Sequence, residues 1–157
     1  MSPAIPTQKL CIILRGLPGT GKTYIANKYL THIRGAFSPI DGPDPDPVIL
    51  SSDDYFLGSN KVYTFDKDKI QEAHKWNWER FRSEVEKGTP LIIIDNTNIK
   101  KFHYAHYLDY ATRHNYITLI VLIPHNESTN RELSERNIHG VDQETIRRMR
   151  KSFEWEL

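Results

Sequence analysis

The sequence contains a single cysteine, Cys11, and no apolar run as long as a signal peptide or a membrane span requires. One cysteine forms no internal disulfide, so nothing in the chain calls for an oxidising compartment. We therefore expect a cytoplasmic or nuclear protein that is not secreted, with no membrane association and no disulfide-linked partner. Cys11 stands in an apolar stretch and is expected to be a small core residue.

The chain also lacks an excess of charge of either sign. Lysine and arginine total 21 and aspartate and glutamate total 20, so the formal net charge is +1. This balance argues against a protein whose whole surface binds nucleic acid, and it is compatible with a local basic groove. With 38% hydrophobic and 26% charged residues over 157 positions, the composition is typical of one soluble globular domain.

Short apolar runs alternate along the chain with segments of helical periodicity. The runs have no period of two, which is typical of parallel strands that are covered on both faces. We therefore predict an α/β three-layer sandwich, in which a parallel sheet of about four strands has helices on both faces. Strands are expected at 10–14, 48–50, 91–94 and 117–123, and helices at 22–34, 66–87, 102–114, 127–137 and 143–154.

A phosphate-binding loop is the strongest motif in the sequence. Residues 16–23 read G-L-P-G-T-G-K-T and match the P-loop pattern G-x-x-x-x-G-K-[ST] in full, directly after a predicted strand and before a predicted helix. Glycines allow successive backbone N–H groups to point at phosphate oxygens, and the helix adds its positive N-terminal end. The predicted nucleotide-binding residues are Gly16, Leu17, Pro18, Gly19, Thr20, Gly21, Lys22, Thr23 and Tyr24.

ATP and Mg²⁺ are the cofactors that this loop implies, although a preference for ATP over GTP is not determined. Lys22 is expected to reach the β- and γ-phosphates as a catalytic residue, and the Thr23 hydroxyl to bind Mg²⁺. Asp95 follows the apolar run 91–94, and its carboxylate would complete the metal site. Alternatively, Asp95 caps the following helix, for which Asn98 is the better candidate.

Two aspartates follow the second predicted strand. A kinase needs a carboxylate beside the acceptor hydroxyl, to orient it and to take its proton. We predict Asp53 as this catalytic base and assign Asp54 a structural or binding role. The alternative is turn chemistry, since serine and aspartate often bond to their own backbone in loops.

A helical lid is expected at residues 125–141, the lid segment. Arg136, and less strongly Arg131, could stabilise the negative charge of a phosphoryl group in transfer. The alternative is that Arg136 forms a surface pair with Glu132, four residues earlier. Arg147, Arg148, Arg150 and Lys151 are expected to form a solvated face, and His103 and His106 are not expected to bind a metal.

Taken in order, the motifs GLPGTGKT, SSDDYF, EAHKWN, IIIDNTN and ERNIHGV resemble the polynucleotide-kinase-like P-loop kinases. Among these, the sequence is similar to the kinase domain of certain ubiquitin-ligase-binding proteins and to their short kinase-only relatives. The resemblance runs from about Lys9 to the C-terminus and implies ATP-dependent phosphorylation of a 5′-hydroxyl on DNA or RNA. By position it assigns the phosphate and metal contacts to Lys22 and Thr23, the base to Asp53, and the lid to Arg136.

The sequence departs from parts of this family. It has no second catalytic domain, and it lacks the paired His-x-Ser/Thr motifs of the cyclic-nucleotide phosphodiesterase relatives. His139-Gly140 stands near the place where phage polynucleotide kinase has a further lid arginine. We expect residues 1–8 to be a tail and residues 9–157 a single P-loop kinase domain. Residues 35–47, which hold four of the nine prolines, are expected to be an exposed loop insertion.

Three functions remain open at this point. The first is a nucleic-acid 5′-hydroxyl kinase, the second a small-molecule or nucleoside kinase, and the third a nucleotide-binding module without catalysis. A nucleic-acid acceptor needs a basic groove and aromatic faces. Trp76 fits the apolar stripe of its helix and is expected in the core. The candidates for the groove are Lys61, Lys67 and Lys69 with Tyr55, Tyr63 and Trp78.

Overall fold

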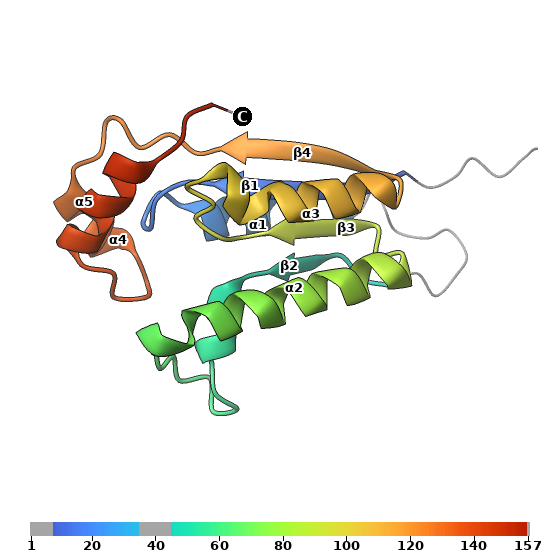
Figure 1. Ribbon diagram of the computed structural model, residues 1–157, viewed down its shortest axis with the longest axis horizontal. Coiled ribbons are helices and arrows are strands. Elements are labelled where there is room, and N and C mark those ends of the chain that lie inside the picture. Colours follow the sequence, from blue (N-terminus) through green and yellow to red (C-terminus); the bar gives the residue numbers. More distant parts are fainter. Residues whose placement is uncertain (1–7, 35–44, 157) are drawn as a thin grey trace, which may run out of the picture.

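The computed structural model describes residues 8–34 and 45–156. Four strands, β1 (Lys9–Arg15), β2 (Val48–Leu50), β3 (Leu91–Ile94) and β4 (Tyr116–Leu122), form one sheet in the order β2-β3-β1-β4. Every pairing is parallel, as predicted (Figure 1). The predicted tail and loop insertion lie largely outside the described residues.

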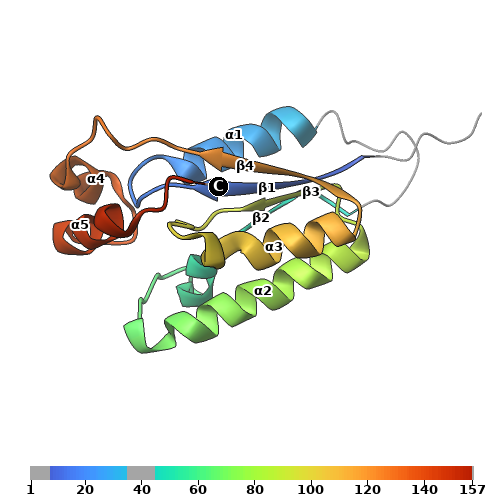
Figure 2. The ribbon, with the colours of Figure 1, turned by 45° about the horizontal axis from the view of Figure 1, so that its top comes forward.

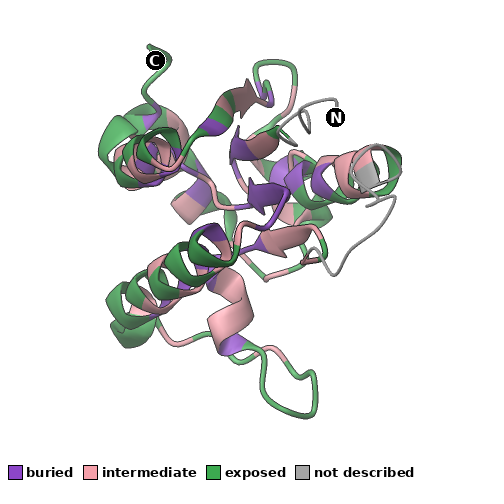
Figure 3. Ribbon diagram, turned by 90° about the vertical axis from the view of Figure 1, so that its right-hand side faces the viewer, coloured by how far each residue is buried: buried purple, intermediate pink, exposed green. Residues whose placement is uncertain are grey.

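Helices cover both faces of the sheet, which confirms the predicted three-layer sandwich. Helix α1 (Lys22–Arg34) lies on one face, and α2 (Ile70–Lys87) and α3 (Lys101–Arg113) lie on the other (Figure 2). Successive residues of β1 serve opposite cores: Cys11 and Ile13 pack under α2 and α3, whereas Ile12 and Leu14 pack under α1. Figure 3 shows the buried strands enclosed between helices whose outer sides are exposed. Both faces are therefore apolar, which explains the unbroken hydrophobic runs.

Two short helices stand beyond the carboxyl ends of the strands (Figure 1). Helix α4 (Asn130–Arg136) begins at a capping box between Thr129 and Glu132, and α5 (Gln143–Ser152) begins at the side chain of Asp142. A small core of Leu17, Leu133 and Ile146 joins both helices to the P-loop. Only α4 falls within the lid predicted at residues 125–141, whereas α5 corresponds to the helix predicted at 143–154. The role of this region as a lid stays a prediction.

The segment between β2 and α2 is less regular than predicted. A 3₁₀ turn, η1 (Ser52–Phe56), follows β2, and a second, η2 (Lys67–Lys69), occupies the start of the predicted helix 66–87. The Asp66 side chain accepts a hydrogen bond from the Asp68 N–H and so forms this separate turn. Helix α2 ends as predicted at Gly88, whose φ is 77°.

Neither tryptophan of α2 has the environment predicted for it. Trp78 packs between α2 and α3 against the rings of Phe81, Tyr107 and Tyr110, so its predicted contact with a ligand is wrong. Trp76 is half-buried and lies beside Tyr55. Two positions along a helix rotate a side chain by about 200°, so only one of the two can face the core.

A buried arginine joins the end of β1 to two distant segments. Arg15 is fully buried, and its guanidinium donates to the carbonyls of Asn98, Ile99 and Glu154. The rings of Tyr104 and Phe153 lie 4.9 and 5.0 Å from it. The loop after β3 and the segment after α5 are therefore fixed to the central strand.

Arg15→Met should lower the free energy of unfolding by roughly 3 kcal/mol or more, because it leaves three carbonyl acceptors without their donor. Urea unfolding measures this loss. Arg113→Met is the matched control, since Arg113 is exposed and, among the described residues, pairs with Asp109 alone; it should change stability by no more than about 0.5 kcal/mol. Equal losses in the two variants would contradict a special contribution of Arg15.

Candidate active site

A cavity of about 660 Å³ lies at the carboxyl ends of the strands. Its walls come from the P-loop, from the segment after β2, from the loop after β3 and from the α4–α5 segment. Ile94 pairs with both Ile13 and Leu50, so the three strands end at the same edge of the sheet. In parallel sheets this edge is the place where ligands bind.

The P-loop contributes six of its nine predicted residues to the cavity wall: Pro18, Gly19, Gly21, Lys22, Thr23 and Tyr24. Gly16, Leu17 and Thr20 lie outside this wall. The Gly16 N–H donates to Thr97 O at 3.0 Å, and the Leu17 side chain is buried against α4 and α5. These residues support the loop from beneath.

Lys22 is a buried cation at the base of the cavity. Its Nζ donates to Leu17 O at 2.9 Å. Burial lowers the pKa of Lys22 to about 8, and the carboxylates of Asp95 and Asp53 oppose this shift. A desolvated ammonium with so few partners gains strongly from an added anion, which is what the motif predicts at this place.

The side chain of Thr23, from the P-loop, contacts that of Asp95, which directly follows β3. The Thr23 hydroxyl donates to Asp95 Oδ2 at 2.7 Å. Burial raises the pKa of Asp95, while the Thr23 hydrogen bond and Lys22 oppose the rise. A hydroxyl and a buried carboxylate are hard oxygen donors that fit Mg²⁺, whose other ligands are usually phosphate and water.

The described residues contain no group of three or more histidine, cysteine, aspartate or glutamate side chains placed to hold a metal. The alternative that Asp95 or Asn98 caps α3 is wrong, because the residue before this helix is Lys100. Asn98 has a φ of 47°, and its side chain donates instead to Leu14 O at 2.8 Å. The metal role of Thr23 and Asp95 stays a prediction.

The two aspartates after β2 point to different partners. Asp53 lines the cavity: Tyr63 donates its hydroxyl to Asp53 Oδ1 at 3.4 Å, and His139 Nε2 lies 3.4 Å from Asp53 Oδ2. Asp54 instead forms an ion pair with Arg80 at 3.1 Å. This division agrees with the structural role predicted for Asp54 and leaves Asp53 available to a ligand.

Hydrogen bonds from Ser52 connect the end of β2 with two other elements. The Ser52 N–H donates to Asn96 Oδ1 at 2.9 Å, and its hydroxyl lies 3.0 Å from His74 Nδ1 on α2. Partial burial lowers the pKa of His74, and the Asp53 carboxylate opposes the shift. Sequence reasoning did not pair these residues, because no motif spans separations of 22 and 44 positions.

The two arginines of the lid segment occupy different places. Arg136 lines the cavity and reaches Ser128 Oγ at 3.5 Å, whereas Arg131 is exposed and bonds to Glu135 at 2.8 Å. The Glu132 carboxylate accepts from the Thr129 N–H at 2.7 Å in the helix cap. Within the described part of the chain it forms no ion pair with Arg136, which was the alternative for that arginine. The structure does not bring Arg131 to the cavity.

The predicted basic groove does not form part of this cavity. Of its six candidates only Tyr63 lines the wall; Lys61, Lys67 and Lys69 are exposed elsewhere. Arg150, expected on a solvated face, instead donates to His125 O and Ser128 O. The acceptor side of the wall is mainly apolar, with Phe56, Phe65, Ile70, Ala73 and Ile138.

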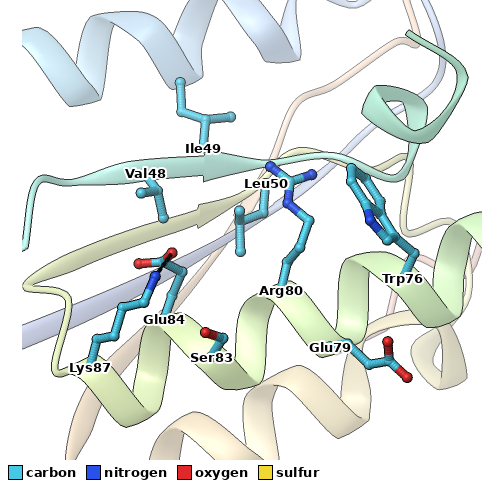
Figure 4. Close-up of a pocket in the computed structure, with 9 residues that line it drawn as sticks. All are labelled: Val48, Ile49, Leu50, Trp76, Glu79, Arg80, Ser83, Glu84 and Lys87. Atoms are coloured by element: carbon cyan, nitrogen blue, oxygen red, sulfur yellow. Dashed lines mark hydrogen bonds and ion pairs between the residues drawn. The ribbon is translucent and has the colours of Figure 1, made fainter. Parts of the chain in front are cut away.

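A second cavity of about 600 Å³ lies between β2 and α2 (Figure 4). Arg80 stands over Trp76 at 4.3 Å while it pairs with Asp54, and Lys87 pairs with Glu84 at 3.0 Å. No P-loop residue lines this cavity. Arg80, Glu84 and Lys87 thus already have protein partners, so we assign this cavity to holding Asp54 and η1 in place.

Close packing between Gly19 and α4 generates a first prediction for the site. A Cβ on Gly19 would lie 2.1 Å from Leu133 O, whereas one on Gly21 would meet nothing within 4 Å. Both residues have positive φ, so alanine should cost about 1–2 kcal/mol at either position. In urea unfolding, Gly19→Ala should lose clearly more stability than Gly21→Ala. Equal losses would contradict the prediction, since they would mean that α4 moves away from the added Cβ at no cost in stability.

The low pKa of Lys22 generates a second prediction. The affinity for Mg·ATP should be constant below about pH 8 and fall above it by up to tenfold per pH unit, because Lys22 then loses its proton in the free protein. Equilibrium binding measures this. Lys22→Arg keeps its charge and should show no such fall. A flat profile for the native protein between about pH 8 and about pH 9.5 would contradict the assignment.

None of the helices in the described part of the chain combines the length and the apolar character that crossing a membrane requires. The fold is similar to that of an APS kinase from Mycobacterium tuberculosis, with a TM-score of 0.52 and 15% sequence identity over 75% of this chain and 77% of that chain. This likeness supports a P-loop kinase-like fold.

Sequence relatives cover nearly the whole chain. NEDD4-binding protein 2 from Homo sapiens is 37% identical over 145 residues, which are 91% of this chain and 8% of that protein. YLP motif-containing protein 1 from Rattus norvegicus is 27% identical over 165 residues, covering 94% of this chain and 11% of that protein. The chain thus spans only a small part of either relative. The family described as AAA domain matches residues 11–155, and the chain belongs to this family of P-loop kinase-like, nucleotide-binding domains.

Proposed function

We propose that this domain transfers the γ-phosphoryl group of ATP to the 5′-hydroxyl of a nucleic acid, with Mg²⁺ as cofactor. The observation that carries the proposal is that Asp53 opens into the same cavity as Lys22, Thr23 and Asp95. A nucleotide-binding switch needs Lys22, Thr23 and Asp95 to bind the nucleotide and its metal. It does not need a further carboxylate such as that of Asp53 on the opposite wall.

In the proposed reaction the acceptor oxygen attacks the γ-phosphorus, the bond to the β–γ bridging oxygen breaks, and ADP leaves. Asp53 orients the hydroxyl and takes its proton. Lys22 stabilises charge on the β- and γ-phosphates, and Arg136 stabilises the transferred group from the lid side. Bound Mg²⁺, held by Thr23 and Asp95, supplies charge neutralisation on the phosphate oxygens.

A nucleic-acid acceptor is supported by the resemblance beyond the P-loop, in SSDDYF, EAHKWN and RNIHGV. The small-molecule or nucleoside kinase remains a second candidate, and one observation favours it. The lysines expected to contact acceptor phosphates lie outside the cavity, whose acceptor side is mainly apolar. Such a wall suits a base or another flat ring more than a chain of phosphates.

Labelled ATP offered with 5′-hydroxyl oligonucleotides, nucleosides and sugars tests the proposal directly. We expect label on the oligonucleotides, with an acceptor KM that rises steeply with salt because acceptor phosphates are bound. Label on nucleosides or sugars alone would favour the second candidate. Binding of ATP without transfer to any member of the panel would favour a nucleotide-binding module.

Asp53→Asn should lower kcat for transfer by about two orders of magnitude or more while ATP still binds. Asp54→Asn is its matched neighbour: it loses the pairing with Arg80 but has no expected part in the chemistry. Lys22→Ala should abolish transfer in a folded protein. If Asp54→Asn were inactive and Asp53→Asn active, the base would be assigned to the wrong residue.

A further inference from the structure

Two segments far apart in the sequence meet on the acceptor side of the cavity. His139, between α4 and α5, lies with its ring centroid 4.5 Å from that of Tyr63, and the two rings are inclined by 37°. The same imidazole places Nε2 3.4 Å from Asp53 Oδ2. One lid residue therefore contacts both the proposed base and the tyrosine that bonds to that base.

The loop that carries His139 is folded around a single side chain. The Asn137 carboxamide donates to the carbonyls of Ser134 and Val141 at 2.7 and 2.9 Å. Its oxygen accepts from the N–H groups of His139 and Val141 at 3.2 and 2.8 Å. Asn137 thus ties the backbone of this loop together, while the imidazole itself is placed by its contacts with Tyr63 and Asp53.

Asp53 is held from two sides, and neither contact is tight. Tyr63 Oη and His139 Nε2 each stand 3.4 Å from one carboxylate oxygen. Both contacts are longer than the usual range, which is about 2.5–3.0 Å for an O–H···O hydrogen bond and about 2.7–3.2 Å for an N–H···O hydrogen bond. Burial and the Asp53 carboxylate raise the pKa of Tyr63, so its hydroxyl remains a donor. A carboxylate held loosely at both oxygens keeps lone pairs free for an acceptor hydroxyl, and such contacts often tighten in the reacting complex.

We propose that His139 is a positioning residue for Asp53: seated on Tyr63, its Nε2 fixes the carboxylate so that a free lone pair faces the acceptor hydroxyl. This inference rests on the proposed kinase function, since it concerns the base of that reaction. It makes proper orientation of the base depend on the position of the lid segment.

The proposal is tested by substitutions that distinguish the packing of the His139 ring against Tyr63 from the contact of its Nε2 with Asp53. His139→Phe keeps a ring against Tyr63 but offers no N–H to Asp53; kcat should fall about tenfold or more with little change in the acceptor KM. His139→Gln restores a donor and should recover part of kcat. His32→Phe is the matched control on the exposed side of α1, where the one described hydrogen-bond partner of His32 is Lys28 O, and its kcat should equal that of the native protein. A normal kcat in His139→Phe would overturn the proposal.

A second arm asks whether His139 acts through Asp53. In an Asp53→Asn background, His139→Phe should cause no further loss of the residual kcat, because the carboxylate that it positions is gone. An equal loss in both backgrounds would assign His139 a purely structural role and overturn the proposal.

A third arm is independent of catalysis and separates this inference from the proposed function. Amide hydrogen exchange at His139 and Val141 should be faster in Asp53→Ala than in the native protein, because the loop then loses its contact across the cavity. Unchanged exchange would overturn the contact itself, whatever the enzyme does. If exchange responds but the native protein transfers phosphate to no hydroxyl, the proposed function fails and the positioning of Asp53 for that reaction fails with it.

Discussion

The buried guanidinium of Arg15 is the interaction on which the geometry of the active site depends. Arg15 ends the central strand, and it binds the loop after β3 and the segment after α5 at once. That loop begins with Asp95, whose own N–H donates to Leu50 O at 2.9 Å, so the sheet holds its first residue and Arg15 holds its end. No carboxylate in residues 8–34 and 45–156 pairs with this side chain, so backbone carbonyls and two aromatic rings offset its desolvation.

The electrostatics of the cavity follow from the burial of two charged side chains, Lys22 and Asp95. Burial lowers the pKa of Lys22 and raises that of Asp95, so in both residues it favours the neutral form. The opposite charge of each residue partly offsets the shift in the pKa of the other. Such a pair is stable enough to fold, yet it still gains from a ligand that adds negative charge near Lys22 and positive charge near Asp95. A nucleotide with a divalent cation adds both. Binding of such a ligand therefore stabilises the charged forms of both Lys22 and Asp95.

The sequence predicts well what depends on local pattern. Apolar runs located the four strands, the P-loop motif located the turn before α1, and Gly88 ended α2. It predicts poorly which of several equivalent residues faces a site. Trp76 and Trp78 belong to one helix, and only packing against α3 decides between them. Asn98 has the chemistry of a helix cap, yet the backbone of β1 binds it instead. The functional roles of the site residues stay predictions.

The two sides of the cavity are built with unequal rigidity, and this difference bears on the choice of acceptor. On the nucleotide side, Lys22 and Asp95 are buried and the contact to Thr23 is short. On the acceptor side, Asp53 and His139 are partly exposed and stand at 3.4 Å from each other. Short buried contacts tolerate little change, whereas long exposed ones adapt at small cost. Under the proposed function, residues 51–65 and 137–141 are therefore the part of the domain in which acceptor specificity can diverge while the phosphate-binding side is kept.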